Sequence, residues 1–470
     1  MLIRDAAYDA LPKAIRAELH ERFADWLASH GSDLLELDEI LGYHLEQAYA
    51  FHRELGASGE AVAPLAERAA GHLGSSGRRA YTRGDAPAAV RLFGRAAALL
   101  PPESSERLKL LPALGDALTE VGAWDDAKTL LSEAAATARR IGDRGAAAEA
   151  AVALVYVELH TDPAASHAKA RAELDHAIRV FEELEDKAAL SRAVYTAAMI
   201  HVWAGDNACA LAEMERAARL AAESGDRMQE QRSISGIVIA LTYGSLPVDA
   251  IREKLDEIAP PVEGTMRPRV QILRTRALLE AMQGRFDEAR RLIAEADTTS
   301  RELGLEMTRA AGVLRAAGEI ELLAGDAAAA ERHFREAYET LERGQDWGHL
   351  ASVAPLLSLA LLAQARVDEA EPPLELTARW ILDDDIDAQI SFLRARAKLA
   401  ALEGDSAGAQ ALARGAVDRA AESDDLNAHA GALVDLAEAL ELGARHGRGP
   451  RPDAAAKSFR CREIVDTRWT

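Results

Sequence analysis

Apolar residues recur along most of this chain at spacings of three and four positions, the pattern of a helix with one buried face. Alternating apolar and polar positions, which would predict strands, are scarce. Alanine and leucine supply most of the apolar residues, and both favour helix. The pattern therefore predicts an all-α protein. Because 470 residues are too many for one ordinary core, we expect several domains or one extended solenoid.

Short turns made of a small residue, glycine and a polar residue interrupt the helical pattern at regular intervals. An alanine follows each glycine by five positions, and Ala365 replaces the glycine in one turn. Two more alanines fill the remaining gaps less cleanly, at Ala170 and Ala250. Successive members lie 38 to 43 residues apart, at Ala89, Ala127, Ala170, Ala210, Ala250, Ala289, Ala330, Ala370 and Ala409. A period of about 40 residues predicts a repeat protein.

Small and large residues take fixed places within most copies, while those near Glu158–Ala177 and Val238–Ile258 are degenerate and Ser358–Thr377 keeps only part of the pattern. A small residue is followed 12 and 19 positions later by alanine and 16 positions later by a large apolar residue. Two antiparallel helices explain these offsets, because small residues at facing positions let the two backbones approach. We expect the large residue to fill the layer between one pair and the next. The clearest copies begin at Gly77, Gly115, Ala198, Ala277 and Gly318.

These offsets resemble those of the tetratricopeptide repeat, whose usual period is about 34 residues. The resemblance implies an all-α, right-handed superhelical solenoid of antiparallel helix pairs, here with about one and a half extra helical turns per pair. We expect about nine pairs and a final helix, forming a repeat domain over residues 56–444. An unrelated helical array with alanine-rich packing is the alternative.

The first 55 residues do not follow the repeat. Two amphipathic segments, Ala17–Leu27 and Glu39–Ala48, predict a helical arm over residues 1–55. The segments Ile3–Tyr8 and Gly42–Ala48 resemble the junction between the ATPase module and the repeats in large bacterial signalling proteins. That group includes signal-transduction ATPases and nucleotidyl cyclases. The resemblance begins abruptly at Met1 and implies the sensor end of a larger architecture, without its ATPase and cyclase domains, or a free-standing descendant.

The last residues, 445–470, differ again. They hold seven Arg or Lys against three Asp or Glu and are rich in glycine and proline near their start. A tenth pair would place its second helix here, and no helical pattern continues. A frameshifted or truncated reading frame and a disordered basic tail are the two explanations.

The net charge is −22, and such a surface repels phosphate backbones, so no nucleic-acid partner is expected. Cys209 and Cys461 stand far apart and form no CxxC motif, which favours a reducing compartment without disulfides. Arg4 and Asp5 interrupt the apolar start, so no signal-peptide core is present. No apolar run is long enough to span a membrane. These features predict a cytoplasmic protein with no membrane partner.

Motifs that carry chemistry are missing from the sequence. It contains no G-x-x-x-x-G-K-[ST] loop, no G-x-S-x-G elbow and no H-E-x-x-H helix. The acidic run Asp383–Asp387 lacks the glycine of a calcium loop, which is Ala388, and has Arg394 at the twelfth position. We interpret it as a solvated loop that caps the next helix. The thirteen histidines are scattered, so we expect no catalytic residue, cofactor or metal site, and no enzyme.

Stacked helix pairs present the first helix of each pair on a concave wall, where such proteins commonly bind peptides. Arginines at the same position of three repeats could clamp a carboxylate or phosphate. The alternatives are that these arginines pair with acidic residues of the next repeat and that the aromatic and Met residues are ordinary core. Counting from the small positions gives the wall candidates Tyr195, Met199, Trp203, Arg274, Arg315, Glu319, Arg394 and Lys398.

The leading hypothesis is a non-catalytic interaction or sensor module of a bacterial signalling system that binds a protein or peptide in this groove. In such architectures, as the resemblance implies, the repeats control an ATPase or cyclase module. A free-standing scaffold or adaptor is the second hypothesis. A helical enzyme with its site among the loops is the third, and the sequence shows no convergent acids or histidines for it.

Overall fold

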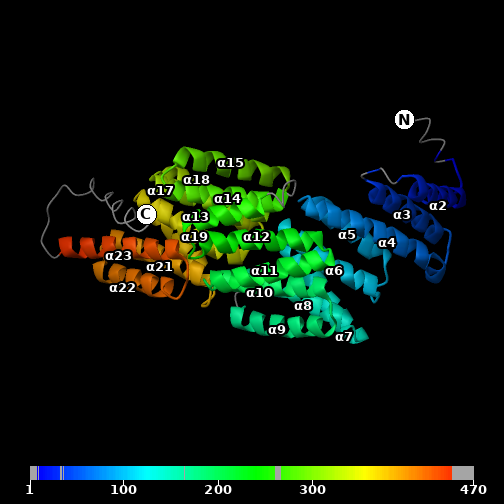
Figure 1. The fold of residues 1–470 in the computed structure, drawn as a ribbon, viewed down its shortest axis with the longest axis horizontal. Coiled ribbons are helices and arrows are strands. Elements are labelled where there is room, and N and C mark those ends of the chain that lie inside the picture. The colour runs from blue at the N-terminus through cyan, green and yellow to red at the C-terminus, as the bar shows by residue number, and fades with distance from the viewer. Residues whose placement is uncertain are drawn as a thin grey trace. The chain divides into compact units, whose positions relative to one another are not determined.

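The structure is a computed structural model that describes residues 8, 10–31, 34, 36–162, 165–259 and 266–446. Over these residues the regular elements are helices, and none is a strand. Successive helices pack against each other as antiparallel pairs (Figure 1). The predicted all-α solenoid of tetratricopeptide-like helix pairs is confirmed. None of the described helices is both long enough and apolar enough to cross a membrane.

The chain forms two compact units, Met1–Leu154 and Val155–Thr470. The boundary falls inside a helix of the predicted repeat domain, α8. The first unit contains α2 Lys13–His30, α3 Leu37–Glu54, α4 Gly59–Thr82, α5 Ala86–Leu99, α6 Ser105–Glu120, α7 Trp124–Ile141 and the start of α8 Arg144–Thr161. The two predicted arm helices are confirmed as α2 and α3, and α3 packs on α4.

The second unit holds the remaining helices. The first helices of successive pairs contact one another. For example, α10 contacts α12, and α19 contacts α21. These helices are α9 His167–Glu183, α10 Lys187–Trp203, α11 Asn207–Ser224, α12 Arg227–Tyr243, α13 Val248–Ile258, α14 Met266–Met282, α15 Phe286–Glu302, α16 Glu306–Thr308, the π-helix η2 Arg309–Leu314, α17 Arg315–Ala324, α18 Ala327–Arg343, α19 Trp347–Ala363, α20 Val367–Trp380, α21 Ile386–Leu402, α22 Ser406–Ala420 and α23 Leu426–His446.

The recurring turns are built as their residues dictate. The glycines of the small–Gly–polar turns, such as Gly205 and Gly325, have φ between 71° and 92°, a conformation that side chains disfavour. Ala365, which replaces glycine in one turn, adopts the same conformation with φ of 58°. Many helices, after these turns and after others, begin with an N-cap carboxylate that accepts a backbone N–H, at Asp85, Asp186, Asp206, Asp226, Asp326, Asp346, Asp385 and Asp405.

The predicted small positions are where two helices of a pair approach most closely. A Cβ on Gly77 would lie 2.8 Å from the Phe93 ring, and one on Gly318 would lie 2.5 Å from the Phe334 ring. The large residue therefore contacts the glycine of its own pair, in addition to the predicted place in the layer between pairs. The predicted final helix is α23, and residues 447–470, most of the predicted basic tail, lie outside the described residues, as does the junction-like start up to residue 7.

Candidate functional site

Early and late helices of the second unit meet at their ends. Asp424, just before α23, accepts the backbone N–H groups of Asn207 at 3.0 Å and Ala208 at 2.8 Å, where α11 begins. One repeat earlier, Asp384 accepts the N–H of His167 at 3.0 Å, where α9 begins. Each carboxylate satisfies N–H groups that a helix start leaves open. Since both contacts join residues 217 apart in the chain, the array closes on itself within this unit.

Arg315 makes a further contact across this interior. Its Nη1 and Nη2 donate to the two oxygens of Asp387 at 2.8 and 3.0 Å, and its Nε donates to Glu319 at 3.0 Å. The Arg315 side chain is 12% exposed. Burial alone would lower the pKa of Arg315, but the carboxylate of Asp387 and the other acidic neighbours keep it raised well above its ordinary value. The guanidinium of Arg315 is therefore charged and joins α17 to α21.

Arg274 is buried without such partners. It is 4% exposed, and its Nε and Nη2 have no hydrogen-bond partner among the described residues. The guanidinium lies 5.7 Å from the centre of the Tyr243 ring, and that of Arg315 lies 5.6 Å from the same ring. On the Arg274 helix, Gln271 Oε1 is also buried without a partner. Two guanidinium groups thus lie beside one aromatic ring, and three buried polar atoms of Arg274 and Gln271 on α14 have no hydrogen-bond partner among the described residues.

The remaining predicted basic residues lie on α21 and have partners on α23. Arg394 donates to Asp435 at 2.6 Å, and Lys398 donates to Glu438 at 3.5 Å. For Arg394, this pair is the alternative raised from the sequence, in which the arginines pair with acidic residues of the next repeat. Lys398 pairs in the same way. The structure therefore gathers Arg274 and Arg315 about Tyr243, while Arg394 and Lys398 face the adjacent helix.

The predicted aromatic and Met positions follow α10. Tyr195 and Met199 are each 8% exposed, and the Arg232 guanidinium lies 4.9 Å from the Tyr195 ring centre. Trp203, at the end of the helix, is only partly buried, and its ring stacks on His167 at 5.7 Å. Trp203 also meets the edge of His160 at 5.2 Å. Tyr195 and Met199 are thus buried core residues, whereas Trp203 lies at the end of the helix beside two histidines.

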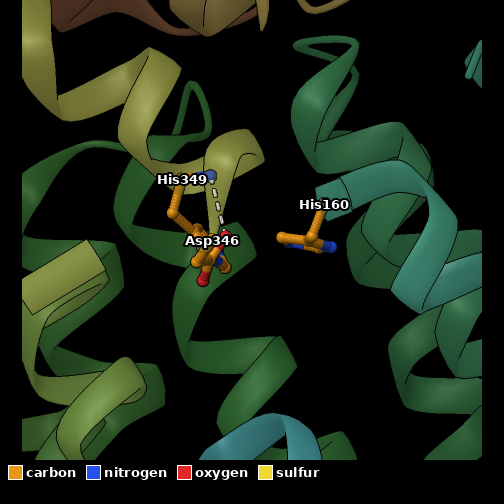
Figure 2. A group of neighbouring side chains, drawn as sticks. All are labelled: His160, Asp346 and His349. Carbon is orange, nitrogen blue, oxygen red and sulfur yellow. Dashed lines mark hydrogen bonds and ion pairs between the residues drawn. The ribbon is translucent and has the colours of Figure 1, made fainter. Parts of the chain in front are cut away.

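A cluster of two histidines and an aspartate lies beside that end. His160 lies in the last turn of α8. Asp346 is the N-cap of α19, and His349 lies in the first turn of α19. Figure 2 shows His160 facing the other two from a separate helix. One ligand atom of each residue lies within 4.8 Å of the others. His349 Nδ1 donates to Asp346 Oδ2 at 2.8 Å, and the two imidazole centres are 4.6 Å apart.

Burial controls the protonation of this cluster. It lowers the pKa of His160 to about 4, so this imidazole is neutral. Burial opposes ionisation of Asp346 and His349 too, but their mutual attraction prevails, so the pKa of Asp346 is lowered and that of His349 is raised. The cluster is therefore a neutral imidazole beside an ion pair.

The sequence does not reveal this cluster, because His160 is far in the chain from Asp346 and His349. One signal was available. The third residue after an N-cap aspartate is small or Gln in the other copies, as at Ala329 and Gln229, whereas Asp346 is followed by His349. The interpretation of Asp383–Asp387 as a helix cap is confirmed for Asp385, but its description as solvated is wrong there, because Asp385 is 8% exposed.

The buried cap at Asp385 predicts a pH-dependent stability. Burial, and then the nearby Asp387 carboxylate, raise the pKa of Asp385 from 3.8 to about 7, although Arg315 and His349 oppose this. Because its pKa is raised, the folded state favours the protonated form of Asp385. This contribution to stability is fully present below about pH 4 and is lost as the pH rises through about 7. Asp385→Asn keeps the acceptor for Ala388 N–H without this dependence. We therefore expect the free energy of unfolding of the variant, relative to that of the wild type, to rise by about 4 kcal/mol between about pH 4 and pH 8.

Urea unfolding of both proteins across this pH range measures the gain. The Asp405→Asn variant, which makes the same change at the exposed cap of α22, is the control. A constant difference between wild type and Asp385→Asn would show that Asp385 ionises normally in the folded state.

Comparisons with known proteins bear on the fold alone. No protein-family model matches the sequence, and no curated protein matches it. Among solved structures, a Rap protein complexed with competence and sporulation factor is 13% identical, with a TM-score of 0.48 over 73% of this chain and 99% of that one. Yeast Tom70 is 15% identical, with a TM-score of 0.37 over 93% and 100%. Human IFIT1, a dimer with m7Gppp-AAAA, is 14% identical, with a TM-score of 0.45 over 80% and 82%.

Proposed function

We propose that this chain is a non-catalytic interaction protein whose second unit binds a peptide or protein segment along its first helices, with Arg274 holding a carboxylate of the ligand. The buried guanidinium of Arg274 carries the proposal. Burying a charge without a partner costs several kcal/mol, and a protein recovers that cost when a ligand supplies the opposite charge. Repeat arrays of this kind present their first helices to such ligands.

The orphaned atoms also indicate the chemistry of the ligand. Nε and Nη2 lie on one edge of the guanidinium, and their two N–H groups match the two oxygens of a carboxylate. Arg315 already uses its Nη1 and Nη2 for Asp387. A free C-terminus or an acidic side chain of a peptide fits the edge that Arg274 leaves open.

Peptide binding with and without the anchor tests this function. Peptides selected on the wild-type protein from a random library with free C-termini would be titrated into Arg274→Gln by fluorescence anisotropy. We expect affinity to fall at least about 30-fold, because losing a buried charge pair costs about 2 kcal/mol or more. Arg394→Gln is the matched control, since Arg394 is paired with Asp435, and should bind nearly as the wild type does.

Circular dichroism would establish that both variants are folded. Equal affinity of wild type and Arg274→Gln for every selected peptide would remove Arg274 as the anchor. Failure of the wild type to select any peptide would remove the proposed function itself.

A finer role, the sensor part of a bacterial signalling system, is supported by the junction-like residues at the start of the chain and by one surface of α2. Ile15, Leu19, Phe23 and Trp26 follow one face of that helix and are 41% to 54% exposed. An exposed apolar stripe of this kind marks an interaction surface. We propose that an ATPase or cyclase module covers it. A free-standing scaffold is the alternative, and identifying the proteins that copurify with the full chain distinguishes the two.

A further inference from the structure

The geometry of His160, Asp346 and His349 points to a binding site for a divalent transition metal of the zinc type, and we propose that the metal joins α8 to α19. Two imidazoles and a carboxylate are ligands that zinc and its neighbours in the series accept. The three residues come from two helices that are far apart in the chain and adjacent in the second unit. This inference is independent of the proposed peptide site.

Two of the ligand atoms lie within about 0.5 Å of the separation that a tetrahedral metal requires. Ligand atoms about 2.0–2.1 Å from a tetrahedral zinc ion lie about 3.3 Å from one another. His349 Nδ1 and Asp346 Oδ2 are 2.8 Å apart, so a cation can replace the proton between them. The third ligand atom lies within 4.8 Å, and a shift of about 1.5 Å in the His160 side chain would complete a set of three.

The surroundings of His160 present the correct nitrogen. Its Nδ1 lies 2.8 Å from the Tyr156 carbonyl, which only accepts, so Nδ1 carries the proton. The neutral imidazole therefore has its lone pair on Nε2, the arrangement in which histidine binds metals. The Cδ2 edge of the ring, next to Nε2, faces Gly348, whose added Cβ would lie 3.1 Å from Cδ2. Glycine at 348 thus lets the ring approach the start of α19.

The carboxylate is also held in place. Asp346 Oδ1 accepts the backbone N–H of His349 at 3.2 Å, which leaves Oδ2 toward the imidazole. Asp346 is fully buried, while the His349 side chain is 26% exposed, so a cation can reach the site from the side of His349. Three protein ligands leave a fourth position for water or for a group of a bound partner.

Metal binding by the full chain tests the inference. The protein would be stripped with a chelator and titrated at neutral pH with zinc by calorimetry and with cobalt by visible absorption. We expect one site per chain with tetrahedral cobalt absorption, and a higher melting temperature with zinc. His160→Gln and Asp346→Asn, the second of which keeps an N-cap acceptor, should each weaken zinc binding about 10-fold or more.

The control is His176→Gln, because His176 is exposed on α9 and outside the cluster. It should bind zinc as the wild type does. The inference is overturned if the wild type shows no zinc or cobalt site, or if His160→Gln and Asp346→Asn bind zinc as tightly as His176→Gln. In that second case the cluster is a hydrogen-bonded brace, and its variants would lower the melting temperature equally with and without zinc.

Discussion

Arg315→Ala is expected to lower the free energy of unfolding by about 3 kcal/mol or more. The change leaves the carboxylates of Asp387 and Glu319 without the cation that both contact, in a place where Arg315 is 12% exposed. Removing one member of a buried pair costs about 3–5 kcal/mol, because the remaining charge stays poorly solvated. The loss should appear in urea unfolding monitored by circular dichroism.

A double-mutant cycle measures the interaction energy between Arg315 and Asp387 apart from their other contacts. Arg315→Ala combined with Asp387→Ala should cost less than the two single changes added together, by at least about 1 kcal/mol. Arg216→Ala is the control, because its pair with Glu182 is more than 40% exposed at both side chains and should be worth less than about 1 kcal/mol. If Arg315→Ala cost no more than Arg216→Ala, the contact between α17 and α21 would not stabilise the second unit.

Phe334→Ala should also be strongly destabilising, by about 3–5 kcal/mol in the same measurement. Phe334 is completely buried, and its ring fills the space left by Gly318 on the facing helix. Removing the ring leaves a cavity that the rigid pair of helices cannot close. Leu323→Ala, at a position 50% exposed on α17, is the control and should cost well under about 1 kcal/mol.

The facing glycine gives a second check on the same contact. Gly318→Ala alone places a Cβ 2.5 Å from the Phe334 ring, so it should destabilise by about 1–3 kcal/mol. In the Phe334→Ala background the added methyl enters empty space and should cost little or restore some stability. Additive losses in the double variant would mean that residues 318 and 334 do not share one packing site.

Both pairs of residues stabilise the same unit at different scales. Phe334 and Gly318 hold one helix pair together, while Arg315 and Asp387 hold together first helices that are 72 residues apart. A linear array needs only the first kind of contact. Contacts between distant repeats belong to a turn that closes on itself. Asp384 and Asp424 make two more of them, by accepting backbone N–H groups where α9 and α11 begin.

The helices, their pairing and their turns follow from local patterns of residues. These features depend on local rules, namely the apolar spacing of a helix, an aspartate that caps its start and a glycine or Ala365 that tolerates positive φ. The facing Gly318 and Phe334 were predictable for the same reason, since their offset repeats in the clearest copies. The candidates Arg274 and Arg315 followed from counting along this repeat.

Which residues meet across the interior depends on how the repeats stack in three dimensions. The small rotation between successive repeats brings His160 to Asp346 and His349, and it has no local signature in the sequence. The same rotation gives Arg315 a carboxylate from another repeat and leaves Nε and Nη2 of Arg274 without a hydrogen-bond partner in the part of the chain that the structure describes. Charge and burial at a position depend on what the whole turn places opposite it, and so the chemistry of the interior could not be deduced from any one repeat.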